Sequence, residues 1–560
     1  MEALLLCSII FAPLAFAAVE PWAFGLLYAV FFGLAARLYI KGLADAPNPL
    51  YKNLLPAVLG VALIGLLQAV TERPVNAPSA VLFTVWRPAT LNAVVTWLFY
   101  AAVLYTVPQL IRTPAQFKRL MWTIFGAALL IALIGMLQKS GENYIIYGLR
   151  KVRGDSFGPF VNRDHGAMFL AMGGLAGLGL FFSGFRALAA HQSHSRFFDL
   201  LAVQFLKLVT LGAIVYGISR TGSRGGLHSF ALSAIVIGFV SAGFLRVRKF
   251  KLAAYAGLAL LLLGYGLFLA GNKRLLGLDG EKFDSSIQTR FSMYRGSLSL
   301  VKDFPAFGVG LGAVQDAFHP YKPSDMPAEL LVRHVHSEWL ELVMQAGFAG
   351  GLIYLAGLAA ALLALLKRWR NSASFTMKAL SGGAFAALLA AAAHSCVDFG
   401  LRMPANALLF YVLLGALASP AAQGTRELSD EYDLPEPRPA PAKYAAAITA
   451  LAILLSAASL PQVLAWQARQ QAREAAPELK LSLLAKALKW DPDSQSAFQL
   501  GAEHYNLALA AKEGACAKFA AGAAAIAPYS RRAPANHFLS GLNLKFRYQS
   551  HRCSRPRPNH

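Results

Sequence analysis

Long apolar runs recur along almost the whole of this 560-residue chain, and they constrain its fold more than any other feature. Each run approaches the roughly 20 residues that an α-helix needs to cross a bilayer. The composition agrees, because 56% of the residues are hydrophobic and only 14% are charged. The sequence therefore predicts an all-α, polytopic integral membrane protein with about 12–13 transmembrane helices and a small helical domain outside the membrane. The predicted spans are 3–18, 22–40, 54–70, 91–109, 119–138, 165–183, 203–218, 226–245, 251–270, 341–366, 377–395, 403–420 and 443–463.

Clusters of Lys and Arg between the spans predict the orientation, because cytoplasmic loops collect these residues. If the N-terminus is cytoplasmic, four clusters fall on that side: Arg37 and Lys41; Arg112, Lys118 and Arg119; Arg246, Arg248, Lys249 and Lys251; Lys367, Arg368 and Arg370. The large loop 271–340 and the C-terminal region then lie outside the cytoplasm. Orientation thus accounts for the net charge of +23, and no nucleic-acid-binding module is apparent. The first run lacks a basic leader and a clear cleavage site, so we expect a retained helix.

The composition changes after residue 420. Residues 421–442 are acidic and Pro-rich, which predicts an exposed cytoplasmic linker before the span 443–463. Residues 464–545 are Ala-rich with a helical period, and Pro492 and Pro528 each separate two amphipathic stretches. Their offset of roughly 36 residues is close to the tetratricopeptide period, so two degenerate repeats and an ordinary helical hairpin are both open. The last residues, 546–560, break the helical pattern and are expected to be disordered.

Several arginines fall on the outer side of this topology, where the orientation rule would exclude them. Arg153 lies in the loop 139–164, Arg220 and Arg224 lie in the short loop 219–225, and Arg290 lies in the large loop. Arginine binds phosphate in a bidentate manner, so these residues predict an anionic ligand such as a lipid-linked pyrophosphate. Arg220 and Arg224 would share a face if their segment were helical. The alternative is that they snorkel from helix ends to water.

His336 opens the segment HSEWLELVMQAGFAGG, which leads from the large polar loop into an apolar run. A titratable imidazole at a membrane surface is costly to retain without a role. The positive end of the helix dipole also favours its neutral, proton-accepting form. We therefore expect His336 to be a general base, the alternative being a capping or headgroup residue. Glu341 could orient a partner or be an ordinary N-terminal charge, and Gly347 and Gly350 are expected to permit tight helix packing.

Two further motifs belong to the same outer face. The run GVGLG resembles a dinucleotide-binding motif, but no strand–helix unit surrounds it, so we expect a tight turn after a membrane-surface helix. The motif HSCVDFGLRMP carries His394, Asp398 and Arg402 around the outer end of the eleventh span. These three residues could line the same cavity as His336, or they could tie two spans together.

The stretch HS-x9-GxxG resembles the H[NSQ]-x9-GxxG motif of bacterial O-antigen ligases and of the related O-antigen polymerases and protein O-oligosaccharyltransferases. The order of features is also similar: SRGG between two spans, PAFGVGLG in the polar loop, then the histidine motif. The resemblance covers residues 1–420 as an O-antigen ligase-like transmembrane domain. It implies an inverting, metal-independent glycosyltransferase without a cofactor, which acts at the periplasmic face of the bacterial inner membrane on a glycan carried by undecaprenyl pyrophosphate. It further implies that Arg224 and Arg290 hold the pyrophosphate, with Arg220 as a second contact, and that His336 activates the acceptor hydroxyl.

The motif leaves the acceptor open. Transfer to lipid A–core, as in a ligase, is the leading hypothesis; a polymerase extends another lipid-linked glycan, and a protein oligosaccharyltransferase modifies Ser or Thr. A transporter of lipid-linked glycans is an alternative of another class, but it needs a polar path through the membrane centre. The expected partners are the donor, the acceptor, membrane lipids and, through the C-terminal repeats, a protein. Glu341, Asp398, His394 and Arg153 are expected to support the site.

Overall fold

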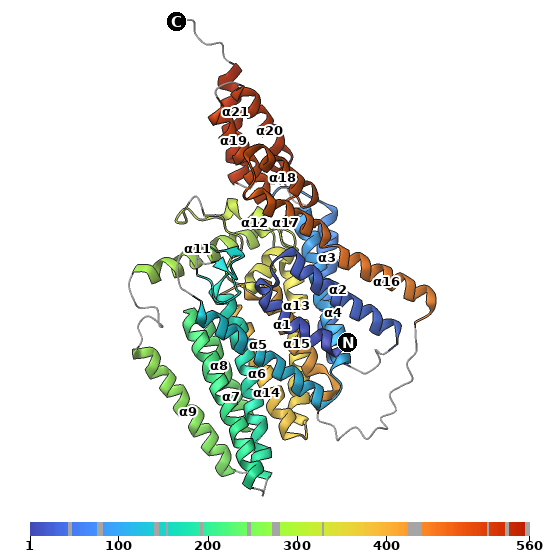
Figure 1. Cartoon of the computed structure of the whole chain (residues 1–560), viewed down its shortest axis with the longest axis vertical. Helices are drawn as coiled ribbons and strands as arrows, with labels where there is room; N and C mark the ends of the chain where they lie inside the picture. The colour runs from blue at the N-terminus through green and yellow to red at the C-terminus, as the bar shows by residue number, and fades with distance from the viewer. Residues whose placement is uncertain are drawn as a thin grey trace.

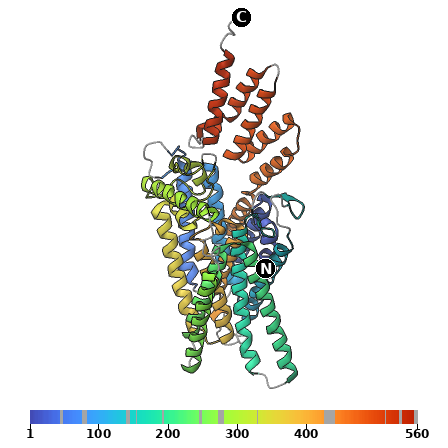
Figure 2. The same cartoon turned by 90° about the vertical axis from the view of Figure 1, so that its left-hand side faces the viewer.

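The protein is almost entirely helical, as the sequence predicts (Figure 1). The computed structural model describes residues 1–42, 48–75, 82–138, 145–152, 155–190, 194–243, 248–271, 281–327, 330–423, 440–511, 514–532 and 537–554. Within these ranges the one sheet is a hairpin of β1 (Ile145–Ile146) and β2 (Arg150–Lys151). Long helices form a bundle, and a smaller group of helices stands on one end of it (Figure 2).

The bundle contains the following elements in chain order: α1 (Glu2–Leu14), η1 (Phe16–Ala18), α2 (Pro21–Ile40), η2 (Leu50–Leu54), α3 (Leu55–Val70), α4 (Arg87–Leu110), α5 (Pro114–Leu137), α6 (Arg163–Ala190), α7 (His194–Thr221), α8 (Arg224–Gly243), α9 (Arg248–Gly271), α13 (Glu338–Asn371), α14 (Phe375–His394), η4 (Gly400–Arg402), α15 (Pro404–Ala418), η5 (Pro420–Gln423) and α16 (Ala442–Ala457). In the described part of the chain, ten helices are long and apolar enough to cross a membrane, and three shorter apolar helices accompany them. Each predicted span coincides with one of these helices. The chain is thus a multi-pass membrane protein.

The centre of the bundle is formed by α15 and the helices around it. Every residue of α15 from Ala405 to Ala418 is buried. α14 packs closely against α6, because its run of glycine and alanine residues lets the two backbones approach. α7 and α8 are much less buried, and with α9 they form one side of the bundle (Figure 1). Their exposed apolar faces suit contact with lipid.

The large outer loop has a folded core of its own. It contains α11 (Glu281–Asp303), α12 (Val314–Ala317) and η3 (His319–Tyr321). Buried residues of α11, including Met293 and Leu300, pack with Val309, Val335 and other apolar residues of the loop and of the segment before α4. The predicted surface helix and the turn that follows it are thus packed over the end of the bundle.

The C-terminal helices are α17 (Leu460–Ala472), α18 (Pro477–Trp490), α19 (Ser494–Ala510), α20 (Ala515–Arg532) and α21 (His537–Ser554). Consecutive helices pack against each other, and they stand at the same end of the bundle as α11 (Figures 1 and 2). The Trp86 indole Nε1–H donates a hydrogen bond to the Pro492 carbonyl at 3.0 Å, which joins this group to the segment before α4.

Two expectations for the C-terminal region are wrong. Pro528 does not separate two helices, because it lies inside the last turn of α20. The expected disordered tail is helical as far as Ser554, since α21 continues through residue 546. The cause is Phe546, which is fully buried and meets the rings of Tyr505 and Phe519. Residues 555–560 lie outside the described part of the chain.

α16 covers the predicted thirteenth span and lies alongside α2. The Ala440 N–H donates a hydrogen bond to the Ile40 carbonyl at 3.0 Å, which joins the start of α16 to the end of α2. Most of the predicted linker 421–442 lies outside the described residues, which resume at 440. α16 leads directly into α17 at Ala458–Ser459, so the C-terminal helices begin beside the outer ends of α2 and α4.

Candidate active site

His336 has a strained backbone at the entrance to α13. Its φ of 53° lies in the left-handed region, which non-glycine residues adopt at a cost and which recurs at functional sites. Ser337 caps the helix, with its hydroxyl accepting from the Leu340 N–H. The Tyr294 hydroxyl, on α11, donates a hydrogen bond to the His336 carbonyl at 2.9 Å. The loop core and the helix cap together hold this conformation.

The imidazole of His336 faces a buried carboxylate. His336 Nδ1 lies 3.4 Å from one oxygen of Asp398, and His165 Nε2, at the start of α6, lies 3.5 Å from the other. Asp398 is 1% exposed. Burial acts to raise its pKa, but the close contact with His336 and the neighbouring histidines prevail and lower the pKa to about 2. The buried Asp398 carboxyl group thus lies between the imidazoles of His336 and His165.

Phe399, next to Asp398, packs among three imidazole rings. The ring of His334 stacks on it at a centroid distance of 4.4 Å, and the rings of His165 and His336 meet it edge-on at 4.7 Å and 5.0 Å. These contacts restrict how each imidazole can turn. The aromatic ring thus fixes the orientation that the pairing with Asp398 requires.

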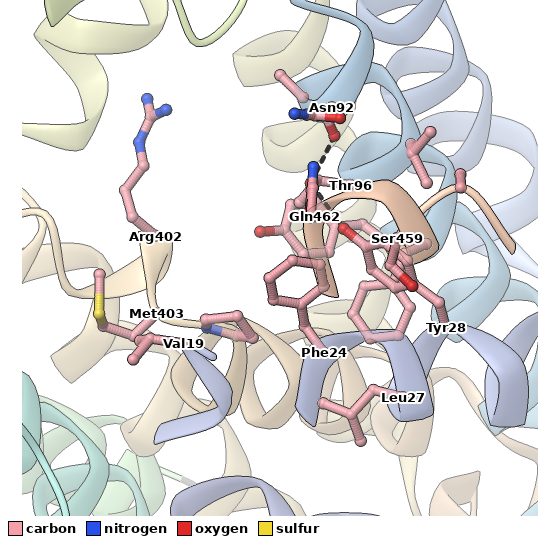
Figure 3. Close-up of a pocket in the computed structure, with 16 residues that line it drawn as sticks. Val19, Phe24, Leu27, Tyr28, Asn92, Thr96, Arg402, Met403, Ser459 and Gln462 are labelled. Carbon is pink, nitrogen blue, oxygen red and sulfur yellow. Dashed lines mark hydrogen bonds between the residues drawn. The ribbon is translucent and has the colours of Figure 1, made fainter. Parts of the chain in front are cut away.

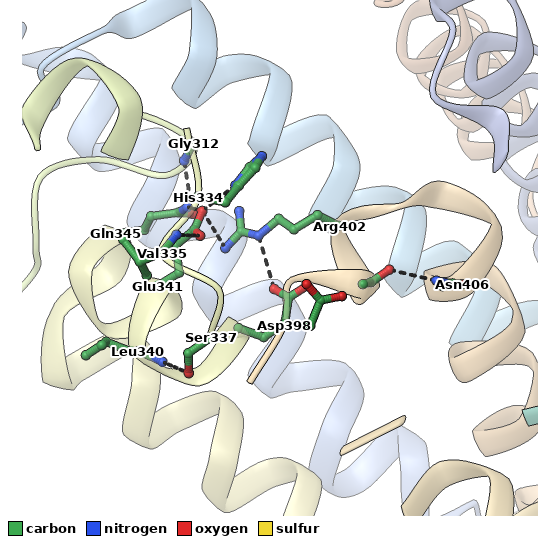
Figure 4. Close-up of polar contacts among 12 residues, drawn as sticks. Gly312, His334, Val335, Ser337, Leu340, Glu341, Gln345, Asp398, Arg402 and Asn406 are labelled. Atoms are coloured by element: carbon green, nitrogen blue, oxygen red, sulfur yellow. Dashed lines mark hydrogen bonds and ion pairs between the residues drawn. The ribbon is translucent and has the colours of Figure 1, made fainter. Parts of the chain in front are cut away.

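A second buried network lies beside the first (Figure 4). Glu341 accepts hydrogen bonds from the Val335 N–H and the Gln345 side chain, and its other close partner is His334 Nδ1 at 3.0 Å. Arg402 reaches Glu338 at 3.1 Å and Glu341 at 3.5 Å. Burial acts to lower the pKa of Arg402, but the two carboxylates prevail and raise it. Glu341 is thus part of the network that joins α13 to η4 and the start of α15.

Gly347 is the first glycine of the histidine motif, and its surroundings leave no room for a side chain. Its φ of 65° and ψ of −172° break the helical geometry inside α13, and a Cβ there would lie 2.2 Å from the Ala306 carbonyl oxygen. The kink exposes backbone groups that the PAFGVGLG loop satisfies: Phe348 N–H bonds to the Pro305 carbonyl, and the Met344 carbonyl accepts from Val309 N–H. The motif and the loop are therefore one structural unit that positions the start of α13.

The arginines approach this centre from two other elements. Arg224 is the first residue of α8, and its neighbour Gly225 lies against the ring of His394, since a Cβ there would be 2.8 Å from Nε2. Arg290 lies on α11 one turn before Tyr294, close enough for its charge to act on Tyr294 and on His394. Arg220 is exposed at the end of α7. Because α7 ends at Thr221, Arg220 and Arg224 lie on different helices and do not share the helical face considered from their spacing.

Residues 209–355 match the family model of the O-antigen ligases. This segment is thus similar in sequence to the O-antigen ligase family. No curated protein matches the chain. The matched segment contains Arg220, Arg224, Arg290 and His336, and with the ten apolar helices it makes the chain a multi-pass membrane protein of the O-antigen ligase or polymerase type, a glycosyl-transferring enzyme.

The ligase domain does not contain the whole constellation. His394 and Asp398, which the sequence singled out, lie beyond the match, and the fold brings them to the start of α8 and to His336, respectively. Glu341 lies in the neighbouring network, whereas Arg153 lies outside the described residues. Among the described residues no group of three His, Cys, Asp or Glu side chains could hold a metal ion.

The sequence analysis did not single out three residues of the candidate site: His165, Phe399 and Tyr294. His165 could have been found, because it stands at the outer start of a predicted span, as His336 does. Phe399 lies inside the HSCVDFGLRMP motif but carries no chemistry that would single it out. To identify Tyr294 one must know how α11 is aligned against the loop, and the sequence pattern alone does not reveal that alignment.

Proposed function

We propose that this protein transfers a glycan from undecaprenyl pyrophosphate to lipid A–core at the periplasmic face of the bacterial inner membrane, with inversion and without a metal ion. The observation that carries this proposal is the pairing of His336 with the buried Asp398 at 3.4 Å. A carboxylate that holds one imidazole nitrogen leaves the other available as a base, which is the arrangement by which enzymes activate hydroxyl groups.

His336 removes the proton from the acceptor hydroxyl. Its Nδ1 faces Asp398, so Nε2 is the nitrogen that takes the proton as the hydroxyl oxygen bonds to the anomeric carbon. The bond from that carbon to the pyrophosphate oxygen breaks, and its electron pair leaves with the pyrophosphate. Attack opposite the leaving group inverts the anomeric centre. The Asp398 carboxylate stabilises the imidazolium that forms.

Arg224 and Arg290 bind the departing pyrophosphate. Guanidinium groups pair with phosphate oxygens in a bidentate manner and stabilise charge that develops on a leaving group. Arg224 begins α8, so the helix N-terminus also favours an anion there. Arg220, on the other side of the turn at Gly222, makes the second contact with the pyrophosphate. The supporting observations are that Gly225, next to Arg224, lies against the ring of His394, and that the charge of Arg290 lowers the pKa of the same histidine.

The proposed orientation rests on where the helix ends lie. α6, α8, α13 and α15 begin at the same end of the bundle, where α7 and α14 finish, as alternating spans require. The clusters of Lys and Arg fall at the other end, the cytoplasmic side by the orientation rule. Cys516 is disulfide-bonded, as suits an oxidising compartment for the C-terminal helices. Those helices are also the surface that we propose for a protein partner.

The test is glycan transfer in proteoliposomes that contain the lipid-linked donor together with either lipid A–core or lipid-linked chains. We expect label on lipid A–core with the wild-type protein, and loss of that label with His336→Asn. Asn tolerates a positive φ, so this variant separates chemistry from backbone strain. Lengthened lipid-linked chains would make the protein a polymerase, and label on protein Ser or Thr would make it an oligosaccharyltransferase. Movement of the donor across the bilayer without transfer would favour the transporter alternative.

A further inference from the structure

A cavity of about 330 Å³ lies beside the active site, among α2, α4, the start of α15 and the junction of α16 with α17 (Figure 3). Its walls combine aromatic rings, those of Phe24, Tyr28 and Tyr100, with the side-chain amides of Asn92 and Gln462. Its volume is in the range of sites that bind small organic groups. Its walls reach from the outer ends of α2 and α17 to Tyr100, near the middle of α4.

The lining of this cavity suits a sugar. A pyranose ring has an apolar face of C–H groups, which aromatic rings can cover, and a rim of hydroxyls, which both donate and accept hydrogen bonds. Side-chain amides can do both in return. A lipid tail would need neither amide, and a phosphate would need more cationic groups than Arg402 alone. The cavity therefore fits a neutral part of a glycan.

The cavity shares the wall residue Arg402 with a second cavity that lies nearer to His336. The second cavity has a volume of about 210 Å³, and its walls include Glu338, Trp339 and Tyr354. Glu338 is two residues from His336. The proposed pyrophosphate ligands come from α8 and α11, which lie on the other side of α13 in Figure 1. A glycan in the cavity thus approaches His336 from the side away from the donor's leaving group.

The C-terminal segment closes this cavity. Ser459 and Gln462, at the start of α17, form one wall. The segment is fitted closely to α2, because a Cβ on Gly25 would lie 2.5 Å from the Ser459 hydroxyl oxygen. The helices beyond the O-antigen ligase domain therefore contribute directly to a pocket next to the site.

We infer that this cavity is the subsite for a sugar of the acceptor, completed by Ser459 and Gln462 of the C-terminal segment. The assignment of this sugar to the acceptor rests on the proposed function, whereas the binding of a glycan in this cavity does not depend on transfer. The C-terminal helices then select the acceptor as well as offering a surface to a partner. Gln462 and Phe24 are specificity-determining residues in this account.

The test measures binding without turnover. Full-length protein carrying His336→Asn is placed in lipid nanodiscs, and the probe is end-labelled core oligosaccharide freed from lipid A, followed by fluorescence polarisation. We expect saturable binding whose Kd rises about fivefold with Gln462→Leu, the loss of about one hydrogen bond, and by a similar factor with Phe24→Leu. The matched control is Gln467→Leu, an exposed amide further along α17, which should leave the Kd unchanged.

Each outcome decides the inference. No saturable binding, or equal Kd values for Gln462→Leu and Gln467→Leu with Phe24→Leu also unchanged, would overturn it. A second probe, the oligosaccharide released from the lipid-linked donor, tests the assignment to the acceptor. If Gln462→Leu and Phe24→Leu weakened the binding of the donor oligosaccharide alone, the cavity would hold donor glycan and the inference would be wrong. Because no transfer is needed, failure of the transfer assay and failure of this binding assay can be told apart.

Discussion

Replacing Asp398 by Asn should slow the chemical step while leaving donor binding intact. The surroundings of Asp398 lower its pKa from 3.8 to about 2, which corresponds to about 2 kcal/mol in favour of the charged carboxylate. The charge stabilises the imidazolium that His336 becomes as it takes the acceptor proton. If that stabilisation is expressed in the transition state, its loss lowers kcat about 30-fold. The KM for the donor should not change, because the proposed pyrophosphate ligands are Arg224 and Arg290.

The assay is initial-rate glycan transfer by reconstituted protein, with donor and acceptor concentrations varied separately. The matched control is Asp325→Asn in the same outer region. Asp325 forms an ion pair with Arg295 at 2.6 Å and has no contact with His336 among the described interactions. This control should retain wild-type kcat. The reasoning would be refuted if Asp398→Asn, folded as judged by thermal unfolding, kept kcat within about threefold of the wild type.

Three further predictions concern structure, donor binding and pH. Gly347→Ala should destabilise the protein by about 3 kcal/mol or more in thermal unfolding, because of its positive φ and the contact with the outer loop. Gly126→Ala lies inside α5 with nothing within 4 Å, so this control should not destabilise the protein. Equal destabilisation by both variants would contradict this. Arg290→Ala should raise the donor KM at least tenfold in the transfer assay, and Arg295→Ala on the same helix should not; similar KM values would refute the pyrophosphate role of Arg290. The folded-state pKa of Asp398 lies below its unfolded value, so its contribution to stability is present above about pH 4 and is lost as pH falls toward 2. Thermal unfolding measured across this range should show that the Tm of the wild type falls more steeply with acid than the Tm of Asp398→Asn. Parallel declines in Tm would argue against the lowered pKa.

The sequence predicted the membrane fold well because length and apolarity alone decide which segments can span a bilayer. Each predicted span corresponds to a helix, and alternation of the spans brought His336, Asp398 and Arg224 to one end before any contact was known. The outer loop was harder to predict. Its folded core depends on how α11 packs over the bundle, and that packing has no periodic signal.

The glycine pattern illustrates the same limit. Gly347 was expected to allow close helix packing, but the residues against it belong to the PAFGVGLG loop and not to a helix, and its positive φ breaks α13. The sequence contained both halves of this unit without revealing that they meet. The C-terminal tail was misjudged for a related reason. One buried aromatic residue, Phe546, gives α21 enough apolar contact to continue where the break in the helical pattern suggested disorder.

The most direct test of the central claim compares transfer by the wild-type protein with transfer by His336→Asn and by a control histidine variant, His319→Asn, in proteoliposomes with lipid-linked donor and lipid A–core. We predict that the wild type and His319→Asn label lipid A–core at similar rates, and that His336→Asn reduces the rate at least 100-fold, as expected for loss of a general base. Full transfer by His336→Asn would contradict the assignment of His336 as the base, and with it the proposed mechanism.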